Sequence, residues 1–78
     1  MSFINRGHHA LAASERVLIV GAGDAGTSLA EELARHPEHG VVVGFVDDSP
    51  RKLRRRIRGI QVLGDSTRIM ELVEGFKI

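Results

Sequence analysis

The residues with the clearest chemical meaning are three glycines, Gly21, Gly23 and Gly26, which follow the apolar run Arg16–Val20 with the spacing G-x-G-x-x-G. In this pattern the first glycine permits a sharp turn out of a strand, and the second leaves room for a pyrophosphate. The third lets a helix pack closely on the strand. The N-terminus of that helix offers unpaired N–H groups and the positive end of a dipole to an anion. The pattern predicts a nucleotide site; the alternative is a tight turn with only a structural role. The predicted contact residues of this loop are Gly21, Ala22, Gly23, Asp24, Ala25 and Gly26.

Two adjacent acids, Asp47 and Asp48, follow the second apolar run, Val41–Val46. A carboxylate at the end of the second strand of a βαβ unit, about 20 residues after the glycines, accepts hydrogen bonds from the adenosine ribose. It also repels a 2′-phosphate, which favours NAD over NADP. The alternation along the strand leaves open which acid faces the ligand. We expect Asp47 to contact the ribose and Asp48 or Ser49 to cap a turn or helix.

The composition excludes several kinds of chemistry. The 78 residues have a net charge of +1 and contain no Cys, Trp or Tyr. Disulfides, thiolate metal sites, cysteine nucleophiles and a tyrosine acid or base are therefore absent, and no catalytic residue is predicted. His8-His9 lacks a nearby third ligand and is interpreted as part of a solvated linker, so no metal site is expected. The small net charge produces no overall electrostatic field that would attract nucleic acid. No apolar run is long enough to span a membrane, and no signal peptide is recognisable, so we expect a cytoplasmic protein.

Hydrophobic spacing indicates the elements that must position these residues. Residues 1–14 show no clear period and are predicted to be a leader or linker, with a short helical turn possible at 10–13. Residues 15–78 are predicted to form the nucleotide-binding domain. The expected elements are strands at Arg16–Val20, Val41–Asp47 and Gly59–Gly64 and helices at Asp24–Arg35 and Arg68–Gly75. The first helix would bury Ala25, Leu29, Ala30 and Leu33, and the last Ile69, Leu72, Val73 and Phe76.

A basic segment separates the second and third strands. It contains Arg51, Lys52, Arg54, Arg55, Arg56 and Arg58, with Leu53 and Ile57 as its apolar anchors. This composition fits a short exposed helix or loop. Three interpretations remain open: a solvated face, a contact for nucleotide phosphates or an acidic partner, and a nucleic-acid contact.

The order β-α-β-(short basic helix or loop)-β-α predicts an α/β fold, a partial Rossmann-like doubly wound parallel sheet. We expect the first strand in the middle, with the second and third strands as unpaired edges. The chain ends where a fourth strand would begin, so we expect a truncated domain. Exposed edges on so small a core also predict a homo-oligomer.

Three blocks carry a family resemblance: VLIVGAGDAG, VGFVDDSP and IRGIQVLGD. Together they resemble the N-terminal Rossmann-like domain, CoA-binding-like or NAD(P)-binding, of bacterial polysaccharide-biosynthesis nucleotide-sugar epimerases and dehydratases of the capsular type. In that family the domain follows membrane helices and precedes a separate catalytic domain. The resemblance covers residues 16–78. It implies a parent enzyme that is anchored in the inner membrane, with this domain on the cytoplasmic side, and is NAD-dependent.

This chain lacks the Tyr-x-x-x-Lys set of that family's catalytic domain, so the resemblance implies a binding module that is not catalytic alone. The module would act with a catalytic domain of the parent enzyme. The expected ligand is NAD, with NADP, CoA and a UDP-sugar as alternatives. Similar blocks occur in the UDP-sugar-binding domain of sugar O-acyltransferases, although Asp24-Ala25 departs from that family's Gly-Gly-His loop. NADH-sensing redox repressors are a more distant likeness, without their DNA-binding winged helix. A cofactor half of an oxidoreductase and a ligand-free assembly domain also remain open.

Overall fold

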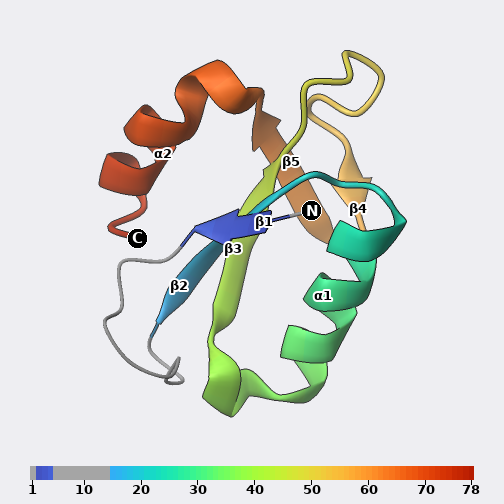
Figure 1. Cartoon of the computed structure of the whole chain (residues 1–78), viewed down its shortest axis with the longest axis vertical. Coiled ribbons are helices and arrows are strands. Elements are labelled where there is room, and N and C mark those ends of the chain that lie inside the picture. The colour runs from blue at the N-terminus through green and yellow to red at the C-terminus, as the bar shows by residue number, and fades with distance from the viewer. Residues whose placement is uncertain (1, 5–14) are drawn as a thin grey trace.

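The apolar runs of the sequence form the parallel centre of a mixed sheet. The computed structural model describes residues 2–4 and 15–78. The parallel strands are β2 (Arg16–Val20), β3 (Val41–Val46) and β5 (Ile60–Gly64). Two short antiparallel strands flank them, β1 (Ser2–Ile4) beside β2 and β4 (Arg56–Ile57) beside β5. The sheet order is therefore β1-β2-β3-β5-β4 (Figure 1).

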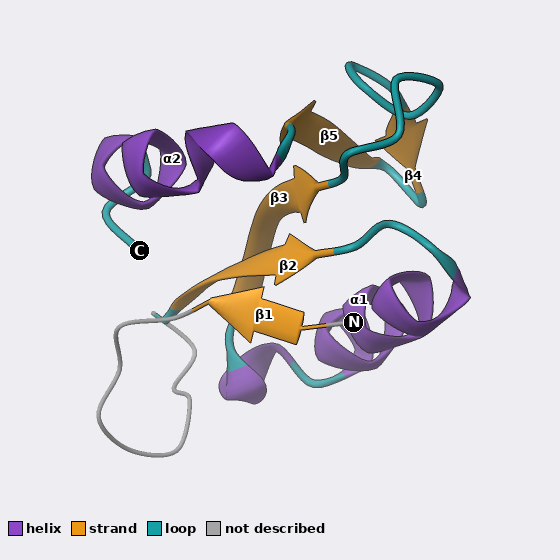
Figure 2. Ribbon diagram, turned by 45° about the horizontal axis from the view of Figure 1, so that its top comes forward, coloured by secondary structure: helices purple, strands orange, loops and turns teal. Residues whose placement is uncertain are grey.

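One helix covers each face of the sheet, as Figure 2 shows. Helix α1 (Asp24–Arg35) connects β2 to β3 through a 3₁₀ turn, η1 (Pro37–His39). Helix α2 (Ile69–Gly75) follows β5 after a second 3₁₀ turn, η2 (Ser66–Arg68). No helix in the described part of the chain is both long enough and apolar enough to cross a membrane.

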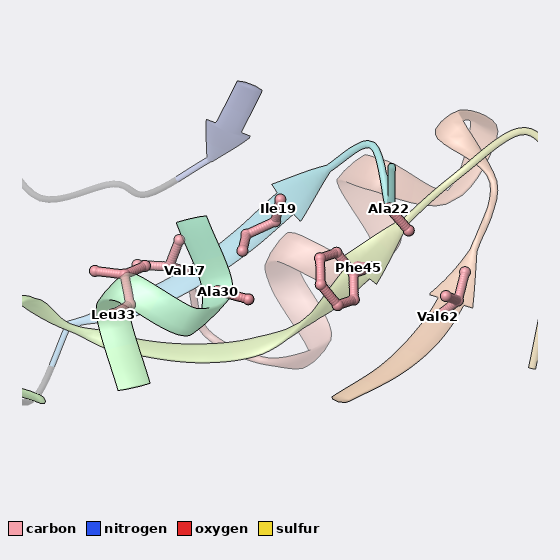
Figure 3. Close-up of a cluster of buried hydrophobic side chains, with 7 residues drawn as sticks. All are labelled: Val17, Ile19, Ala22, Ala30, Leu33, Phe45 and Val62. Carbon is pink, nitrogen blue, oxygen red and sulfur yellow. The ribbon is translucent and has the colours of Figure 1, made fainter. Parts of the chain in front are cut away.

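The core consists of two clusters because successive side chains of a strand point to opposite faces. Val17 and Ile19 of β2 pack with α1, whereas Leu18 between them packs toward α2. The α1 cluster, drawn in Figure 3, contains Val17, Ile19, Ala22, Ala30, Leu33, Phe45 and Val62. The α2 cluster contains Leu18, Val46, Leu72, Val73 and Ile78. Burial on both faces explains the continuous apolar sequence of β2.

The predicted α/β class with a parallel, doubly covered sheet is confirmed, and β2 and α1 have the predicted bounds. The predicted strand order is wrong, because β3 and not β2 lies in the middle of the parallel strands. After β3 the chain reverses direction and forms β4, which is antiparallel to β5. It then reverses again and forms β5 between β4 and β3, parallel to β3. To reach the other side of β2 from the end of β3, the chain would have to cross over β2, and the short basic connection contains no helix that would make such a crossing.

The edges of the sheet also differ from the prediction. Both edge strands, β1 and β4, were missed because three and two residues are too few to show a period. They cover the outer edges of β2 and β5, which weakens the edge-pairing argument for self-association. The homo-oligomer itself is untested. The expected solvated His8-His9 and the helical turn at 10–13 lie outside the described residues, and the division into a leader and a domain stays a prediction.

Two predicted core positions are exposed. Ala25 faces solvent, while the next residue, Gly26, is buried where α1 approaches β2. Phe76 is 37% exposed, and Ile78 instead completes the α2 cluster at 4% exposure, with its N–H donating to the carbonyl of Val73. The chain leaves the helix after Gly75, so helical spacing no longer governs these last positions.

The β4–β5 hairpin generates the first prediction. Its two loop residues, Arg58 and Gly59, have φ values of 54° and 80°, the left-handed pair that a two-residue type I′ turn requires. Arginine is strained there, whereas asparagine is tolerated. We expect Arg58→Asn to raise the free energy of unfolding by about 0.5–1 kcal/mol, a gain of several degrees in Tm. Thermal unfolding measures this.

Arg58→Ala is the matched control. Both variants lose the exposed contact between Arg58 and Glu31, in which Nε and Oε2 are 3.7 Å apart, but alanine keeps the left-handed strain. The alanine variant should therefore show no gain. Equal Tm values for the two variants would contradict this account of the turn.

Candidate functional site

The carboxyl ends of the three parallel strands lie together at one end of the sheet. Val20 is level with Val46, and Val46 is level with Gly64. Two backbone hydrogen bonds extend this alignment beyond the strands: Gly21 N–H donates to the Val46 carbonyl at 2.7 Å, and Asp47 N–H donates to the Gly64 carbonyl at 3.0 Å. The glycine loop, the acidic pair and the β5–η2 turn therefore lie side by side, at the edge where open α/β sheets bind ligands.

The three glycines of the loop have different local environments. Gly21 has a φ of 104°, a turn out of β2 that other residues rarely adopt. A Cβ on Gly26 would collide with the Gly21 carbonyl oxygen and lie 3.4 Å from Cγ2 of Ile19. Gly23 is in an extended conformation, and a Cβ there would meet nothing within 4 Å. The turn and the close approach agree with the pattern, and Gly23 leaves open space in front of the helix.

The N-terminus of α1 borders this open space. Gly23 is its N-cap, and no side chain caps the helix within the part of the chain that the structure describes. The Gly23 carbonyl accepts from the Thr27 N–H at 2.9 Å and so begins the helical hydrogen bonds. Asp24 and Ala25 are exposed in the first turn. First-turn N–H groups without a side-chain acceptor are suited to bind an anion.

Asp47 links the glycine loop to the connection that follows β3. Its Oδ2 accepts from the Ala22 N–H at 2.7 Å, and its Oδ1 accepts from the Ser49 N–H at 2.8 Å. The Lys52 Nζ lies 3.7 Å from Oδ2, and the Asp47 side chain is only 14% exposed. The Ala22 N–H first, then the Ser49 N–H and the Lys52 ammonium, hold the pKa of this carboxyl below its usual value. Asp47 is therefore ionised and already hydrogen-bonded within the protein.

Asp48 points to a different partner. Its Oδ1 accepts from the Ser66 N–H at 2.8 Å and its Oδ2 from the Ser66 hydroxyl at 3.1 Å. Asp48 thereby joins the end of β3 to the turn before α2, while Asp65 caps η2 by accepting from the Thr67 N–H at 3.0 Å. The sequence left open which acid faces the ligand. The geometry shows that both acids hold neighbouring loops in place.

A cavity of about 140 Å³ lies between these loops, lined by Val20, Gly21, Val46, Asp47, Asp48 and Ser66. It is smaller than the roughly 300–1,000 Å³ of a typical small-molecule pocket, so a larger ligand would extend over the surface beside it. Ser66 lines this cavity and was not among the predicted site residues, and Lys52, beside Asp47, belongs to the basic segment for which a phosphate contact was one of three open interpretations. The rule that parallel strands end at one edge could have indicated Ser66, because it closely follows β5.

The predicted site residues thus fall into two adjoining groups, the loop at 21–26 and the acids at 47 and 48, which the Ala22–Asp47 hydrogen bond joins. Contact of these residues with a ligand stays a prediction. In the described segments, 2–4 and 15–78, no three His, Cys, Asp or Glu residues are grouped so that they could hold a metal ion.

Comparison with known proteins adds four findings. None of the models of known protein families matches this sequence. The chain is 39% identical over 67 residues to a probable polysaccharide biosynthesis protein, EpsC, of Bacillus subtilis (strain 168); the match covers 85% of this chain and 11% of that protein. The fold is similar to the crystal structure of RSP, a Rex-family repressor, with a TM-score of 0.70, 26% identity, and coverage of 78% of this chain and 29% of RSP.

A second RSP structure, in complex with β-NADH, matches with a TM-score of 0.67 and the same identity and coverage. The solved structures support the Rossmann-like fold, and the relative supports the resemblance to polysaccharide-biosynthesis proteins. The chain spans a small part of each of these proteins. An epimerase or dehydratase parent therefore stays a prediction.

The Asp47 contacts generate a stability prediction with a defined pH dependence. Because its pKa is lowered in the folded state, Asp47 stabilises the protein above its unfolded pKa of about 3.9, and this contribution disappears as pH falls through the folded pKa. Asp47→Asn should cost about 1.5–3 kcal/mol at pH 7, because two N–H groups lose a charged acceptor. The difference in unfolding free energy from the wild type should shrink as pH falls below about 4. Urea unfolding across this range measures it.

Glu74→Gln is the control, because Glu74 is an exposed acid for which no side-chain contact is found among the described residues. The free energy of unfolding of this variant should equal that of the wild type across the same pH range. If Asp47→Asn differed from the wild type by the same amount at pH 7 and pH 2, the ionised form of Asp47 would not be the stabilising form.

Proposed function

We propose that this chain is a nucleotide-binding module that holds an adenine dinucleotide of the NAD type. The observation that carries the proposal is the open, uncapped start of α1, where Gly23 leaves space and the first-turn N–H groups have no side-chain acceptor. A pyrophosphate placed there would receive hydrogen bonds from N–H groups of residues 23–26 and the favourable end of the helix dipole. Similarity to RSP, whose structure with β-NADH also matches, supports this ligand class.

The adenosine ribose would then lie toward the cavity beside Asp47 and Asp48. Ala22 would help to fix the loop through its N–H bond to Asp47, while Gly21 and Gly26 would maintain the turn and the helix approach. Asp24 and Ala25, which are exposed at the helix start, would border the pyrophosphate. CoA and a UDP-sugar are the alternative ligands, because both also carry a diphosphate.

The setting of the module is part of the proposal. Similarity to EpsC supports a role beside a catalytic domain in polysaccharide biosynthesis, in which this module binds a nucleotide and contributes no catalytic residue. We propose an epimerase or dehydratase parent that is anchored in the inner membrane, with the module on the cytoplasmic side. We also propose that the chain self-associates, because a core this small gives a folded monomer little stability. The sheet edges no longer support this part of the proposal.

Gly23→Val tests the proposal. The added side chain enters open space and an extended backbone, so folding should be unaffected, but it would occupy the position proposed for the pyrophosphate. Calorimetric titration of the wild type with NADH, NADPH, CoA and UDP-N-acetylglucosamine should detect binding of a dinucleotide. The variant should lose at least 100-fold in affinity, since it excludes the diphosphate from its hydrogen bonds.

The matched control is Gly75→Val, which also adds a side chain in open space but lies at the end of α2. It should bind like the wild type. Equal affinity of the Gly23→Val variant and the wild type, with both folded by circular dichroism, would contradict the proposed position of the ligand. Binding of none of the four ligands to the wild type would contradict the function itself.

A further inference from the structure

Each oxygen of the two acids already accepts a hydrogen bond from the protein. In Asp47 the donors are the N–H groups of Ala22 and Ser49. In Asp48 they are the N–H and the hydroxyl of Ser66. An acid that selects an unmodified ribose accepts hydrogen bonds from the ribose hydroxyls, and an acceptor lone pair that the protein already uses is no longer open to them. The two acids use part of this acceptor capacity to bind neighbouring loops.

A cation stands beside the acid that was expected to repel a phosphate. The Lys52 ammonium lies 3.7 Å from Oδ2 of Asp47, and the Lys52 side chain is 37% exposed, so it partly offsets the carboxylate and remains accessible. The same connection contains Arg51, Arg54, Arg55 and Arg56, which form no ion pair with the described residues. Lys52 is therefore the part of the basic segment that adjoins the ribose position.

A second cavity extends this basic surface along the same edge of the sheet. It has a volume of about 160 Å³ and is lined by Leu53, Arg54, Leu63, Gly64, Asp65 and Arg68. Asp65 accepts hydrogen bonds from Thr67, and Arg68 pairs with Glu71 at 3.1 Å. Arg54 is thus the lining cation without an ion pair in the described structure. The Asp47 N–H bond to the Gly64 carbonyl places this cavity next to the first one.

We propose that the nucleotide carries a phosphate on its adenosine ribose, and that Lys52 and Arg54 bind this phosphate. The inference rests on the proposed function and reverses the preference for NAD that an acid after β3 predicts. A phosphate monoester has a charge of about −1.5 to −2 at pH 7, and cations such as Lys52 and Arg54, which belong to the same basic segment, bind it through charge-assisted hydrogen bonds. Both a 2′-phosphate, as in NADP, and a 3′-phosphate, as in CoA, offer this chemistry.

Two ligand pairs that differ by one ribose phosphate test the proposal: NADP against NAD, and CoA against dephospho-CoA. Calorimetry of the whole chain at 50 mM salt should give at least about tenfold tighter binding for the phosphorylated member of one pair or of both. The difference should narrow at 300 mM salt, because ions screen exposed charges. A difference in the first pair alone identifies the 2′-phosphate, and one in the second pair alone the 3′-phosphate.

Lys52→Gln should remove most of this difference and leave the affinity for the unphosphorylated member within about twofold. Lys52→Arg should restore it, because the positive charge is retained. Lys77→Gln, the same change at an exposed position beyond α2, should bind like the wild type. Arg54→Gln gives a second, independent loss of selectivity.

Three results would overturn the inference. Tighter or equal binding of NAD and dephospho-CoA by the wild type would refute it and leave the proposed function intact. An equal loss for both members of a pair in Lys52→Gln would assign Lys52 to positioning Asp47 instead of to the phosphate. Failure of all four ligands to bind would refute the inference together with the proposed function.

Discussion

The arrangement of the site depends on one hydrogen bond, from the Ala22 N–H to the Asp47 carboxylate. It joins the loop after β2 to the end of β3, and the same carboxylate accepts the Ser49 N–H. Each bond to a charged group contributes about 1.5–3 kcal/mol, and the low exposure of Asp47 limits competition from water. The loop holds the start of α1 in position, so a side chain that directly follows β3 helps to determine where the helix presents its N–H groups.

The covering of both faces and both edges explains how so short a chain supports this arrangement. Clusters on opposite faces of the sheet share the strands β2 and β3, so each strand contributes to both. The hairpin of β4 and β5 with its two-residue loop forms one edge of the sheet, and β1 forms the other. Part of the backbone of β2 and β5 that would be open at an edge is thereby paired within the chain, and the outermost strands, β1 and β4, are short.

The sequence predicted the elements of this fold better than their arrangement. The bounds of Arg16–Val20 and Asp24–Arg35 were predicted because continuous apolar residues and the glycine spacing are local signals. The order of the strands was not predicted, because it depends on β4, where the chain reverses its direction. This strand has only two residues and therefore shows no detectable period. The hydrogen-bond partners that join Asp47 and Asp48 to other loops were also missed, because they are far from these acids in the sequence. Ala22 and Ser66 become neighbours of these acids only through the register of β2, β3 and β5.

The central claim is that a nucleotide lies on the loop that Asp47 fixes, and backbone NMR tests it most directly. A ¹⁵N-labelled chain would be titrated with NADH and NADPH while every amide is followed. The account predicts that the largest shifts occur at residues 21–27, with a second group at 47–54, as the pyrophosphate and the ribose occupy their positions. Saturable chemical-shift changes confined to the opposite end of the sheet, around residues 37–42 at the start of β3, would contradict it.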